Sequence, residues 1–283
     1  MKFLVTGAAG QLGTDVVAHL ADTDHEVDGR DRAMLDISDA TAVDRALAAT
    51  KPDVVINGAA FTAVDRCENE VDVATAINEH GVRHLARACA RHETHLIHIS
   101  TDYVFDGTLD RPYREDDTTN PQSVYGRTKL AGERAAFDEL GDDATVVRTS
   151  WVCGEHGNNM VKLVIRLAAG DTPLAFVDDQ RGCPTFTADL APSLVALAEQ
   201  RPGGVVHLTN SGAVSWYEFV RATLTASGHD PDRVRPISTA ELDPPRPAPR
   251  PANSVLDDVR WRALGHRPMR DFREPLSELV ERL

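Results

Sequence analysis

Short apolar segments alternate with amphipathic stretches along most of the chain, and this alternation constrains the fold more than any other feature. The apolar segments have strand length and occupy residues 4–7, 25–29, 53–58, 95–100, 145–150, 173–177 and 204–210. The amphipathic stretches lie at 11–21, 39–50, 68–92, 123–140, 158–170, 187–200 and 215–227. Such alternation builds a parallel sheet with helices on both faces. The sequence therefore predicts a doubly wound α/β fold.

The alternation stops towards the C-terminus, where the segment DPPRPAPRPANS at 243–254 is rich in proline and arginine. Proline excludes this segment from a regular helix or a central strand. We predict that residues 1–150 form the sheet domain and that 178–210 return to it. Residues 151–283 are expected to form mainly a smaller lobe at the carboxyl ends of the strands.

The length of 283 residues and the hydrophobic content of 42% exclude a disordered chain or a disulfide-stabilised miniprotein. No apolar run approaches the roughly 20 residues of a membrane helix, and the N-terminus lacks the apolar core of a signal peptide. We expect a cytoplasmic protein without a membrane partner. The four cysteines are scattered without a CxxC pair, which indicates free thiols rather than a zinc ribbon or a disulfide framework.

The formal net charge is -14, and only four of the 30 basic residues are lysine. Genomic base composition together with solubility is one explanation for this acidic, lysine-poor chain. Adaptation to high salt, where screening removes the self-repulsion of the chain, is the explanation that we favour. Under either explanation the chain lacks the basic patch of a nucleic-acid-binding protein.

A glycine motif, Gly7-Ala8-Ala9-Gly10-Gln11-Leu12-Gly13, directly follows the first strand and opens the first helix. In this context the first glycine permits a tight turn, the second lets the backbone approach a pyrophosphate, and the third lets the helix pack against the strand. The phosphates would then lie on the N-terminus of the helix. The motif predicts a dinucleotide site and makes the expected fold Rossmann-type.

The choice between NADH and NADPH stays open in the sequence. Asp31 follows the second strand, eighteen positions beyond Gly13. An acid near this distance accepts hydrogen bonds from the adenosine ribose of NAD, whereas a neighbouring arginine can hold the 2′-phosphate of NADP. Arg30 and Arg32 flank Asp31, so both signals are present, and either arginine can equally be solvated surface.

A second motif, Tyr125-Gly126-Arg127-Thr128-Lys129, lies in a predicted helix. The spacing of four residues brings the tyrosine and the lysine to one helix face, where an ammonium can favour the ionised form of a phenol. The hydroxyl-bearing group Ser100-Thr101-Asp102-Tyr103 ends the fourth strand, at the edge where open parallel sheets carry their reactive groups. Together these features predict a catalytic tyrosine, although a tyrosine–lysine pair alone is typical of a helix surface.

Several longer strings resemble one family. They are GAAGQLG (7–13), NGAAFTAVDRCE (57–68), STDYVFDG (100–107), YGRTKLAGE (125–133), RTSWVCG (148–154), GNNMVK (157–162), VDDQRGCPTFTADLA (177–191) and RPANSVLD (250–257). Over essentially the whole chain, they resemble the dTDP-4-dehydrorhamnose reductase family of the extended short-chain dehydrogenase/reductase superfamily. STDYVFDG discriminates most, because sugar-nucleotide epimerases and dehydratases usually carry a different segment there.

The resemblance implies NAD(P)H-dependent reduction of the C4 keto group of a dTDP-4-keto-6-deoxyhexose. It makes Tyr125 the general acid, Lys129 the residue that orients the nicotinamide ribose and tunes the phenol, and Thr101 the hydroxyl that holds the substrate carbonyl. Residues 1–150 become the cofactor-binding domain and the lobe becomes substrate-binding.

The resemblance also implies binding positions. Besides the catalytic pair, the expected cofactor contacts are Gly7, Gly10, Gln11, Leu12, Gly13, Asp31, Arg32, Asp36, Ile37, Ala59, Ala60 and Thr62. The expected substrate contacts are Val64, Thr101, Asp102, Tyr103, Tyr125 and Trp151. Trp151 at the end of a strand can alternatively be a core aromatic.

Some features depart from the family or stay ambiguous. Family members can form a dimer bridged by magnesium through glutamates, but this chain has Asp15 and Asp189 near those positions, so we predict no metal and leave a homodimer open. Cys153 replaces an aromatic residue of the family. Histidines 80, 84, 92, 95 and 98 have no HExxH pattern and are interpreted as core or surface residues. The charge runs 114–117 and 142–143 are interpreted as solvated loops.

Two further alternatives remain. Within 243–254, Arg246 or Arg250 either pairs with the diphosphate of the substrate or belongs to a stiff connecting loop. For the whole chain, one alternative is a reductase or epimerase of another nucleotide sugar. The other is a non-catalytic NADP-binding regulatory subunit like that of methionine adenosyltransferase, which resembles the same family.

Overall fold

The computed structural model describes residues 1–170 and 173–283 and confirms the Rossmann-type α/β fold. Six strands form a sheet in the order β10-β5-β4-β3-β1-β2, and all neighbouring strands are parallel. Their bounds are Lys2–Thr6 (β1), Glu26–Arg30 (β2), Val54–Asn57 (β3), His95–Thr101 (β4), Ala144–Thr149 (β5) and Gly204–His207 (β10). The strand order reverses between β1 and β3, and ligands of open α/β sheets bind in the crevice beside such a reversal.

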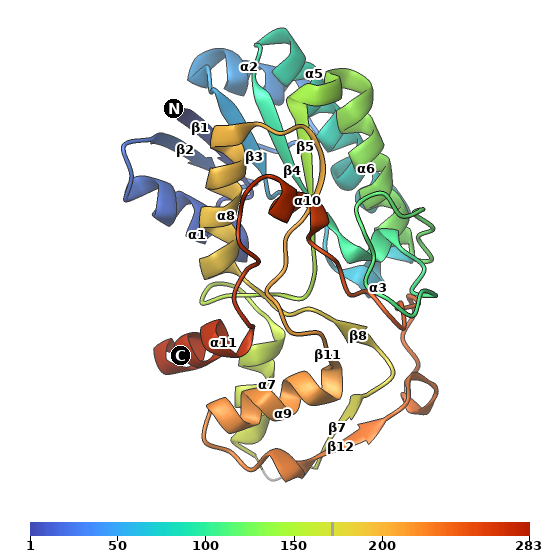
Figure 1. Cartoon of the computed structure of the whole chain (residues 1–283). Helices are drawn as coiled ribbons and strands as arrows, with labels where there is room; N and C mark the ends of the chain where they lie inside the picture. Colours follow the sequence, from blue (N-terminus) through green and yellow to red (C-terminus); the bar gives the residue numbers. More distant parts are fainter. Residues whose placement is uncertain (171–172) are drawn as a thin grey trace.

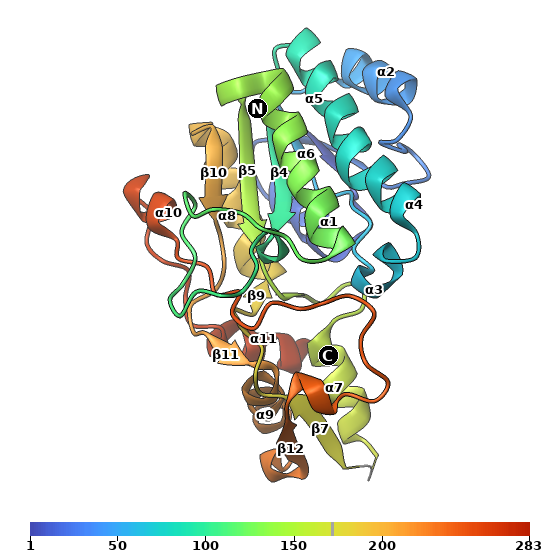
Figure 2. The same cartoon turned by 90° about the vertical axis from the view of Figure 1, so that its right-hand side faces the viewer.

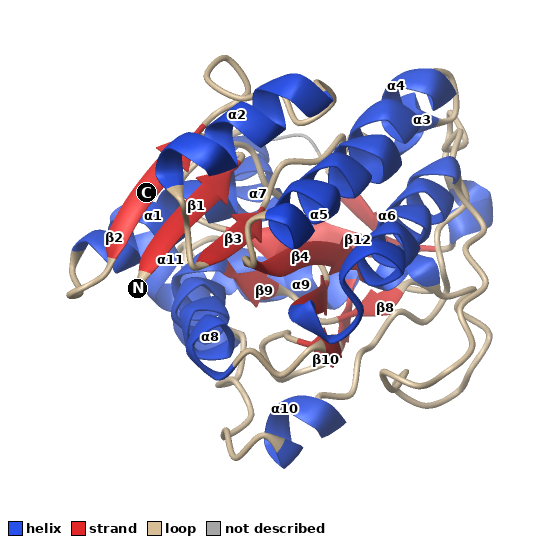
Figure 3. Cartoon of the chain, turned by 90° about the horizontal axis from the view of Figure 1, so that it is seen from above, coloured by secondary structure: helices blue, strands red, loops and turns tan. Residues whose placement is uncertain are grey.

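Helices cover both faces of this sheet (Figures 1 and 3). Phe3 and Val5 of β1 face the layer made by α1 (Gln11–Ala21) and α8 (Thr187–Gln200), whereas the intervening Leu4 faces the opposite layer. That opposite layer contains α2 (Ala40–Thr50), α5 (Val82–Arg91) and α6 (Val124–Leu140). Because successive side chains of a strand point to opposite faces, the sheet packs against one buried apolar cluster on each face.

The helix expected over 68–92 differs from the prediction at its start. The structure has a short α3 (Val64–Cys67), then α4 (Val71–Thr75), a π-helical turn η1 (Ala76–Gly81) and α5 in succession. At this turn α6 lies very close, because a Cβ atom on Gly132 would stand 2.2 Å from the backbone oxygen of Asn78. The close packing accounts for the glycine, and the Asn78 side chain contacts Thr128 of α6.

A smaller lobe lies at the carboxyl ends of the sheet strands (Figures 1 and 2). It contains α7 (Met160–Ala168), α9 (Trp216–Ala226) and α11 (Arg273–Arg282), together with the two-stranded sheets β7–β12, β8–β11 and β6–β9. The strands span Val152–Cys153 (β6), Leu174–Val177 (β7), Arg181–Gly182 (β8), Thr185–Phe186 (β9), Val214–Ser215 (β11) and Val234–Ile237 (β12). Two apolar clusters pack the lobe internally.

The chain crosses between the sheet and the lobe more than once. After β9, α8 packs against α1 and β10 joins the edge of the main sheet beside β5. After the lobe, α10 (Val259–Ala263) returns to β10 before α11 ends the chain in the lobe. None of the helices in the described part of the chain is long and apolar enough to span a membrane.

Candidate active site

The glycine loop between β1 and α1 is packed too tightly for side chains. Gly7 has a φ of 69°, and a Cβ atom there would stand 2.8 Å from the backbone nitrogen of Ala59. A Cβ atom on Gly13 would stand 2.2 Å from the backbone oxygen of Gly7. Gly10 begins α1 without a side-chain cap, so the amide groups of the first turn face the loop. This geometry fits a dinucleotide diphosphate held by backbone amides at a helix N-terminus.

Two adjoining cavities run along the carboxyl edge of the sheet, and the expected cofactor residues line them. The cavity beyond β2 is lined by Gly7, Gly10, Asp31, Arg32, Asp36, Ile37, Ala59 and Ala60. The cavity beside α6 is lined by Gly7, Gly10, Gln11, Leu12, Gly13, Ala60, Thr62, Tyr125 and Lys129. The glycine loop and the loop after β3 line both cavities, as an extended dinucleotide requires.

The side chains of Asp31 and Arg32 differ in how strongly contacts within the protein constrain them. Asp31 accepts a hydrogen bond from the backbone nitrogen of Met34 at 2.9 Å. Arg32 is mostly exposed, and its guanidinium lies 3.9 Å from the carboxylate of Asp36. Asp36 also accepts hydrogen bonds from Ser38, which lower the pKa of its carboxyl group.

The cavity beside α6 has a volume of about 440 Å³ and brings together the three expected catalytic residues. Thr101 ends β4, while Tyr125 and Lys129 lie one turn apart on α6. The expected substrate residues Val64, Asp102, Tyr103 and Trp151 line the same cavity. A cavity of this size lies within the roughly 300–1,000 Å³ of a typical small-ligand pocket.

The electrostatics of Tyr125 differ from the prediction based on its spacing to Lys129. Burial raises the pKa of the phenol, and a hydrogen bond with Thr101 is the strongest influence in the opposite direction. Lys129 is only 2% exposed, and its amine donates to the backbone oxygen of Ile99 at 2.6 Å. Burial lowers the pKa of Lys129 to about 8. The phenol is therefore held in its protonated form, and the expected shift towards ionisation is wrong for this structure.

Asp102 adds a buried carboxyl group beside Thr101. One of its oxygens, Oδ1, accepts a hydrogen bond from Thr101 Oγ1 at 3.0 Å. Within residues 1–170 and 173–283, the other oxygen, Oδ2, has no hydrogen-bond partner. Burial raises the pKa of Asp102 to about 6, although the nearby hydroxyl groups of Ser254 and Thr101 act in the opposite direction. An acceptor of this kind fits a hydroxyl group of a ligand, because a buried acceptor without a partner is costly.

Aromatic side chains form the wall on the lobe side. Trp151 is half-buried and stacks on Trp216, with ring centroids 3.5 Å apart and planes 7° apart. Both rings line the cavity. Trp151 therefore combines the two expected environments, since it packs on a neighbour and also faces the cavity. The sequence gives no signal for Trp216, because nothing local shows that it meets residue 151.

The proline- and arginine-rich segment 243–254 crosses from the lobe to α3, as expected without regular structure (Figure 2). Arg250 donates to both carboxylate oxygens of Asp65 on α3, at 2.5 and 2.8 Å. Arg246 lies 3.6 Å from the same carboxylate. Both arginines line a further cavity, together with Tyr103 and Trp216. The segment thus brings two cations to the mouth of the site, and Asp65 fixes them there.

Comparisons with known proteins agree with this geometry. A sequence model described as the RmlD substrate binding domain matches residues 1–283. A dTDP-4-dehydrorhamnose reductase of Streptomyces griseus is 47% identical over 282 residues, which cover 98% of this chain and 92% of that protein. The chain belongs to the dTDP-4-dehydrorhamnose reductase family.

Solved structures of this family superpose closely on the chain. The crystal structure of a dTDP-4-dehydrorhamnose reductase from Clostridium acetobutylicum has a TM-score of 0.95 and 40% identity, and the match covers 99% of each chain. That of a dTDP-4-dehydrorhamnose reductase from Bacillus anthracis, in complex with NADP, has a TM-score of 0.94 and 33% identity. It covers 100% of this chain and 99% of that chain.

In this member of the dTDP-4-dehydrorhamnose reductase family, a buried ion pair supports α6, the helix that carries Tyr125 and Lys129. Glu133 lies one turn beyond Lys129 and accepts hydrogen bonds from Arg148 of β5 at 3.0 and 2.7 Å. Ser100 of β4 donates to the same carboxylate at 2.5 Å. Glu133 and Arg148 are 2% and 4% exposed. The pair ties α6 to two neighbouring strands, and sequence reasoning missed it because its partners lie on different elements that meet only in the folded chain.

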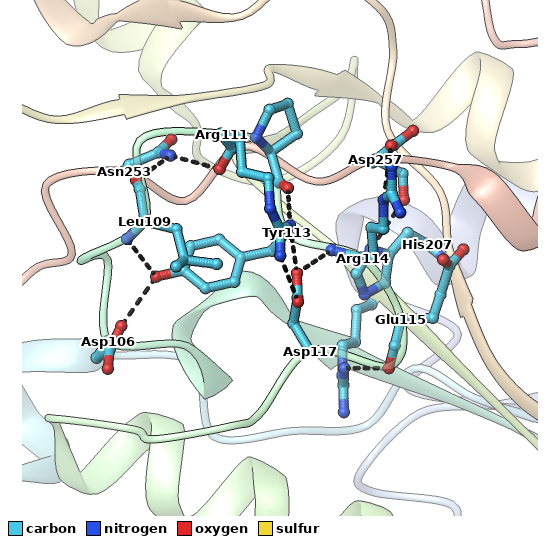
Figure 4. Close-up of polar contacts among 12 residues, drawn as sticks. Asp106, Leu109, Arg111, Tyr113, Arg114, Glu115, Asp117, His207, Asn253 and Asp257 are labelled. Atoms are coloured by element: carbon cyan, nitrogen blue, oxygen red, sulfur yellow. Dashed lines mark hydrogen bonds and ion pairs between the residues drawn. The ribbon is translucent and has the colours of Figure 1, made fainter.

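One charge run is not the solvated loop that the sequence suggested. Glu115 is half-buried and lies beside His207 (Figure 4). Its carboxylate accepts hydrogen bonds from the backbone nitrogens of Arg260 and His207. Burial raises the pKa of Glu115. Asp117 binds both terminal nitrogens of Arg111 at 2.7 Å. These contacts fasten the loop after β4 to the C-terminal part of the chain.

The remaining polar candidates have structural partners. His95 contacts Thr145 and His84 contacts the backbone oxygen of Ile37. Asp189 pairs with Arg270. In the described ranges, no group of three or more His, Cys, Asp or Glu side chains is placed to hold a metal ion. All four cysteines are free and buried.

Proposed function

We propose that the protein reduces the C4 keto group of a dTDP-4-keto-6-deoxyhexose with NADPH or NADH, as in the conversion of dTDP-4-dehydrorhamnose to dTDP-L-rhamnose for glycan biosynthesis. The observation that carries this proposal is the meeting of Thr101, Tyr125 and Lys129 in a cavity that the glycine loop also lines. The names of the relatives support the substrate class.

The cofactor side of the cleft fits a dinucleotide. Side chains at Gly7 and Gly13 would fill the space that a diphosphate needs, and the first turn of α1 offers amide donors to it. Asp31 is the partner for ribose hydroxyls, and the exposed Arg32 is the partner for a 2′-phosphate. When bound, the dinucleotide supplies the hydride that adds to the carbonyl carbon.

The protein supplies the proton and the alignment. When substrate binds, the Thr101 hydroxyl exchanges its hydrogen bond to Asp102 for one to the carbonyl oxygen. The Tyr125 phenol protonates that oxygen as negative charge develops there. Because burial raises the pKa of the phenol, Tyr125 enters the reaction with its proton in place. Lys129 orients the nicotinamide ribose from the floor of the cleft.

The substrate side supplies recognition. Asp102 Oδ2 accepts a sugar hydroxyl, and Val64, Tyr103 and Trp151 provide surfaces for the sugar ring. Arg250 and Arg246 exchange part of their pairing with Asp65 for the diphosphate of the nucleotide, because a guanidinium matches phosphate oxygens.

Turnover tests this proposal. The purified protein should oxidise NADPH or NADH when a dTDP-4-keto-6-deoxyhexose is added, as measured by loss of absorbance of the reduced nicotinamide. A preference for another nucleotide sugar would favour the alternative that the protein is a reductase or epimerase of that sugar. Normal cofactor binding without turnover of any keto sugar would instead favour a regulatory subunit.

Several predictions accompany the reductase. The division into domains at residue 150, the cytoplasmic location, the homodimer and the adaptation to high salt all stay predictions. The net charge of -14 supports the adaptation to high salt.

A further inference from the structure

The amine of Lys129 has an unusual neighbour beneath the catalytic cleft. Besides donating to Ile99, Lys129 Nζ lies 3.4 Å from Nε2 of His98, whose side chain is fully buried on β4. A neutral imidazole carries its proton on one of two nitrogens, so its contact with an amine can run in either direction. The second nitrogen of His98 decides the direction.

That second nitrogen, Nδ1, lies 3.0 Å from the side-chain nitrogen of Asn57. The side-chain oxygen of Asn57 accepts the backbone N–H of Ala59 at 3.1 Å, and this backbone group can only donate. The orientation of the Asn57 amide is therefore fixed, with its NH₂ group towards His98. An amide NH₂ group can only donate, so His98 Nδ1 accepts and carries no proton.

A neutral His98 then carries its proton on Nε2, which faces Lys129. An ammonium group has three donors and no acceptor, whereas a neutral amine offers a lone pair. The hydrogen bonds are consistent in one direction only, from Asn57 to His98, from His98 to Lys129, and from Lys129 to the backbone of Ile99.

We propose that His98 is a positioning residue whose Nε2–H favours the neutral form of the Lys129 amine and connects the charge of this amine to the cofactor loop at Ala59. The donor chain stands independently of the reaction, but its consequence for turnover rests on the proposed function. Ala59 belongs to the loop that lines both cofactor cavities through residues 58–60. A dinucleotide diphosphate adds negative charge and favours the ammonium, so above pH 8, where the amine of the free protein is mostly neutral, binding should take up about one proton from solvent at Lys129.

The charged groups around Lys129 come from three elements. On α6, Glu133 favours the ammonium form and is itself paired with Arg148 of β5. From the β4 side, His98 faces the amine directly, and Asp102 lies in the same cavity lining. Burial opposes charge on both partners, since it lowers the pKa of Lys129 to about 8 and places that of His98 well below its ordinary range.

The small number of lysines permits a direct measurement. Only residues 2, 51, 129 and 162 are lysine, so protein labelled with ¹³C at the lysine ε-carbon gives four signals by NMR. The Lys129→Met variant assigns the signal of Lys129. We expect this signal to titrate near pH 8, well below the others. Titration of Lys129 together with the exposed lysines would overturn the proposal.

Two substitutions separate the contacts of His98. In His98→Gln the longer amide keeps an N–H donor near the position of Nε2, whereas His98→Asn keeps a partner for Asn57 and loses the donor to Lys129. The pKa of Lys129 should rise by about one unit in His98→Asn, the size of one hydrogen bond, and stay near the parental value in His98→Gln. Equal values in the parent and both variants would contradict the proposal.

A measurement on the unmodified protein does not depend on the folding of these variants. In ¹⁵N-histidine NMR, His98 should show an unprotonated Nδ1 and a protonated Nε2, and a proton on Nδ1 would refute the donor chain.

Calorimetric titration with NADPH above pH 8, in buffers of different ionisation enthalpy, should show uptake of about one proton. Uptake of none would refute the connection to the cofactor. A protein that passes these tests but fails to turn over keto sugars would disprove the proposed function and leave the donor chain intact.

Discussion

The two sides of the cleft are built in different ways. The cofactor side consists of short loops that directly follow β1, β2 and β3, and its fit depends on backbone groups. The substrate side is assembled from side chains on separate segments, such as Asp65 with Arg250 and Trp151 with Trp216. A site made of backbone tolerates changes in nearby side chains, whereas a site made of side chains depends on each of them. Dinucleotide affinity and substrate recognition should therefore respond to different mutations.

Tyr125 lies where the two sides meet, and its loss should have the largest effect. Tyr125→Phe removes the proposed proton donor while it keeps the ring, so kcat should fall by about 10²- to 10⁴-fold. Dinucleotide affinity should stay unchanged, because we propose that the backbone at Gly7 to Gly13 holds the diphosphate. Stopped-flow absorbance and fluorescence titration measure the two quantities. A variant with a native circular dichroism spectrum and near-normal kcat would mean that another group supplies the proton.

Arg250 tests the substrate side alone. In Arg250→Gln one charge-assisted contact to the diphosphate is lost, and KM for the nucleotide sugar should rise by about 10- to 100-fold. The matched control is Arg246→Gln, whose side chain is 60% exposed and lies farther from Asp65. This control should change KM by only a few fold. A larger effect at Arg246, or a loss of dinucleotide affinity in either variant, would break the separation of the two sides.

The raised pKa of Asp102 predicts that recognition of the sugar depends on pH in the acidic range, whereas binding of the dinucleotide does not. Its pKa is raised to about 6, so the carboxylate is present above pH 6 and is lost as the pH falls through that value. If the carboxylate binds a sugar hydroxyl, kcat/KM for the sugar should decrease by about tenfold from pH 7 to pH 5. Asp102→Asn should remove this limb of the profile. Persistence of the same limb in the variant would assign it to another group.

Salt should have the smallest effect and should act on the whole molecule. Screening shortens from roughly 10 Å at 0.1 M salt to about 3 Å at 1 M, which relieves the repulsion of a chain with a net charge of -14. The melting temperature should rise with KCl by about 2–4 °C for each kcal/mol of repulsion removed, and activity should persist. Thermal melts by circular dichroism at increasing KCl measure this. A falling melting temperature would contradict adaptation to high salt.

The same contrast explains what the sequence could predict. Strand and helix periodicity, with the turn at Gly7, are local properties, so the sheet, its helices and the cofactor loops followed from the sequence. Family strings also predicted Thr101, Tyr125 and Lys129 as catalytic residues, and the structure brings these three side chains to one cavity.

The rest depends on tertiary contacts. Asp65 and Arg250 are 185 residues apart, and Trp216 meets Trp151 only in the folded chain. The pKa of Tyr125 was mispredicted because spacing on a helix does not show how deeply the phenol is buried. His98 was interpreted as an ordinary core histidine, since its contact with Lys129 crosses from β4 to α6.

Deuterium transfer tests most directly whether the two sides converge on one carbonyl group. The protein would be given NADPH that carries deuterium at C4 of the nicotinamide, together with dTDP-4-dehydrorhamnose, and the product would be examined by NMR. We expect deuterium at C4 of the sugar and one equivalent of NADP⁺ for each sugar reduced. A sugar without deuterium at C4, recovered from protein that binds both ligands, would contradict the account.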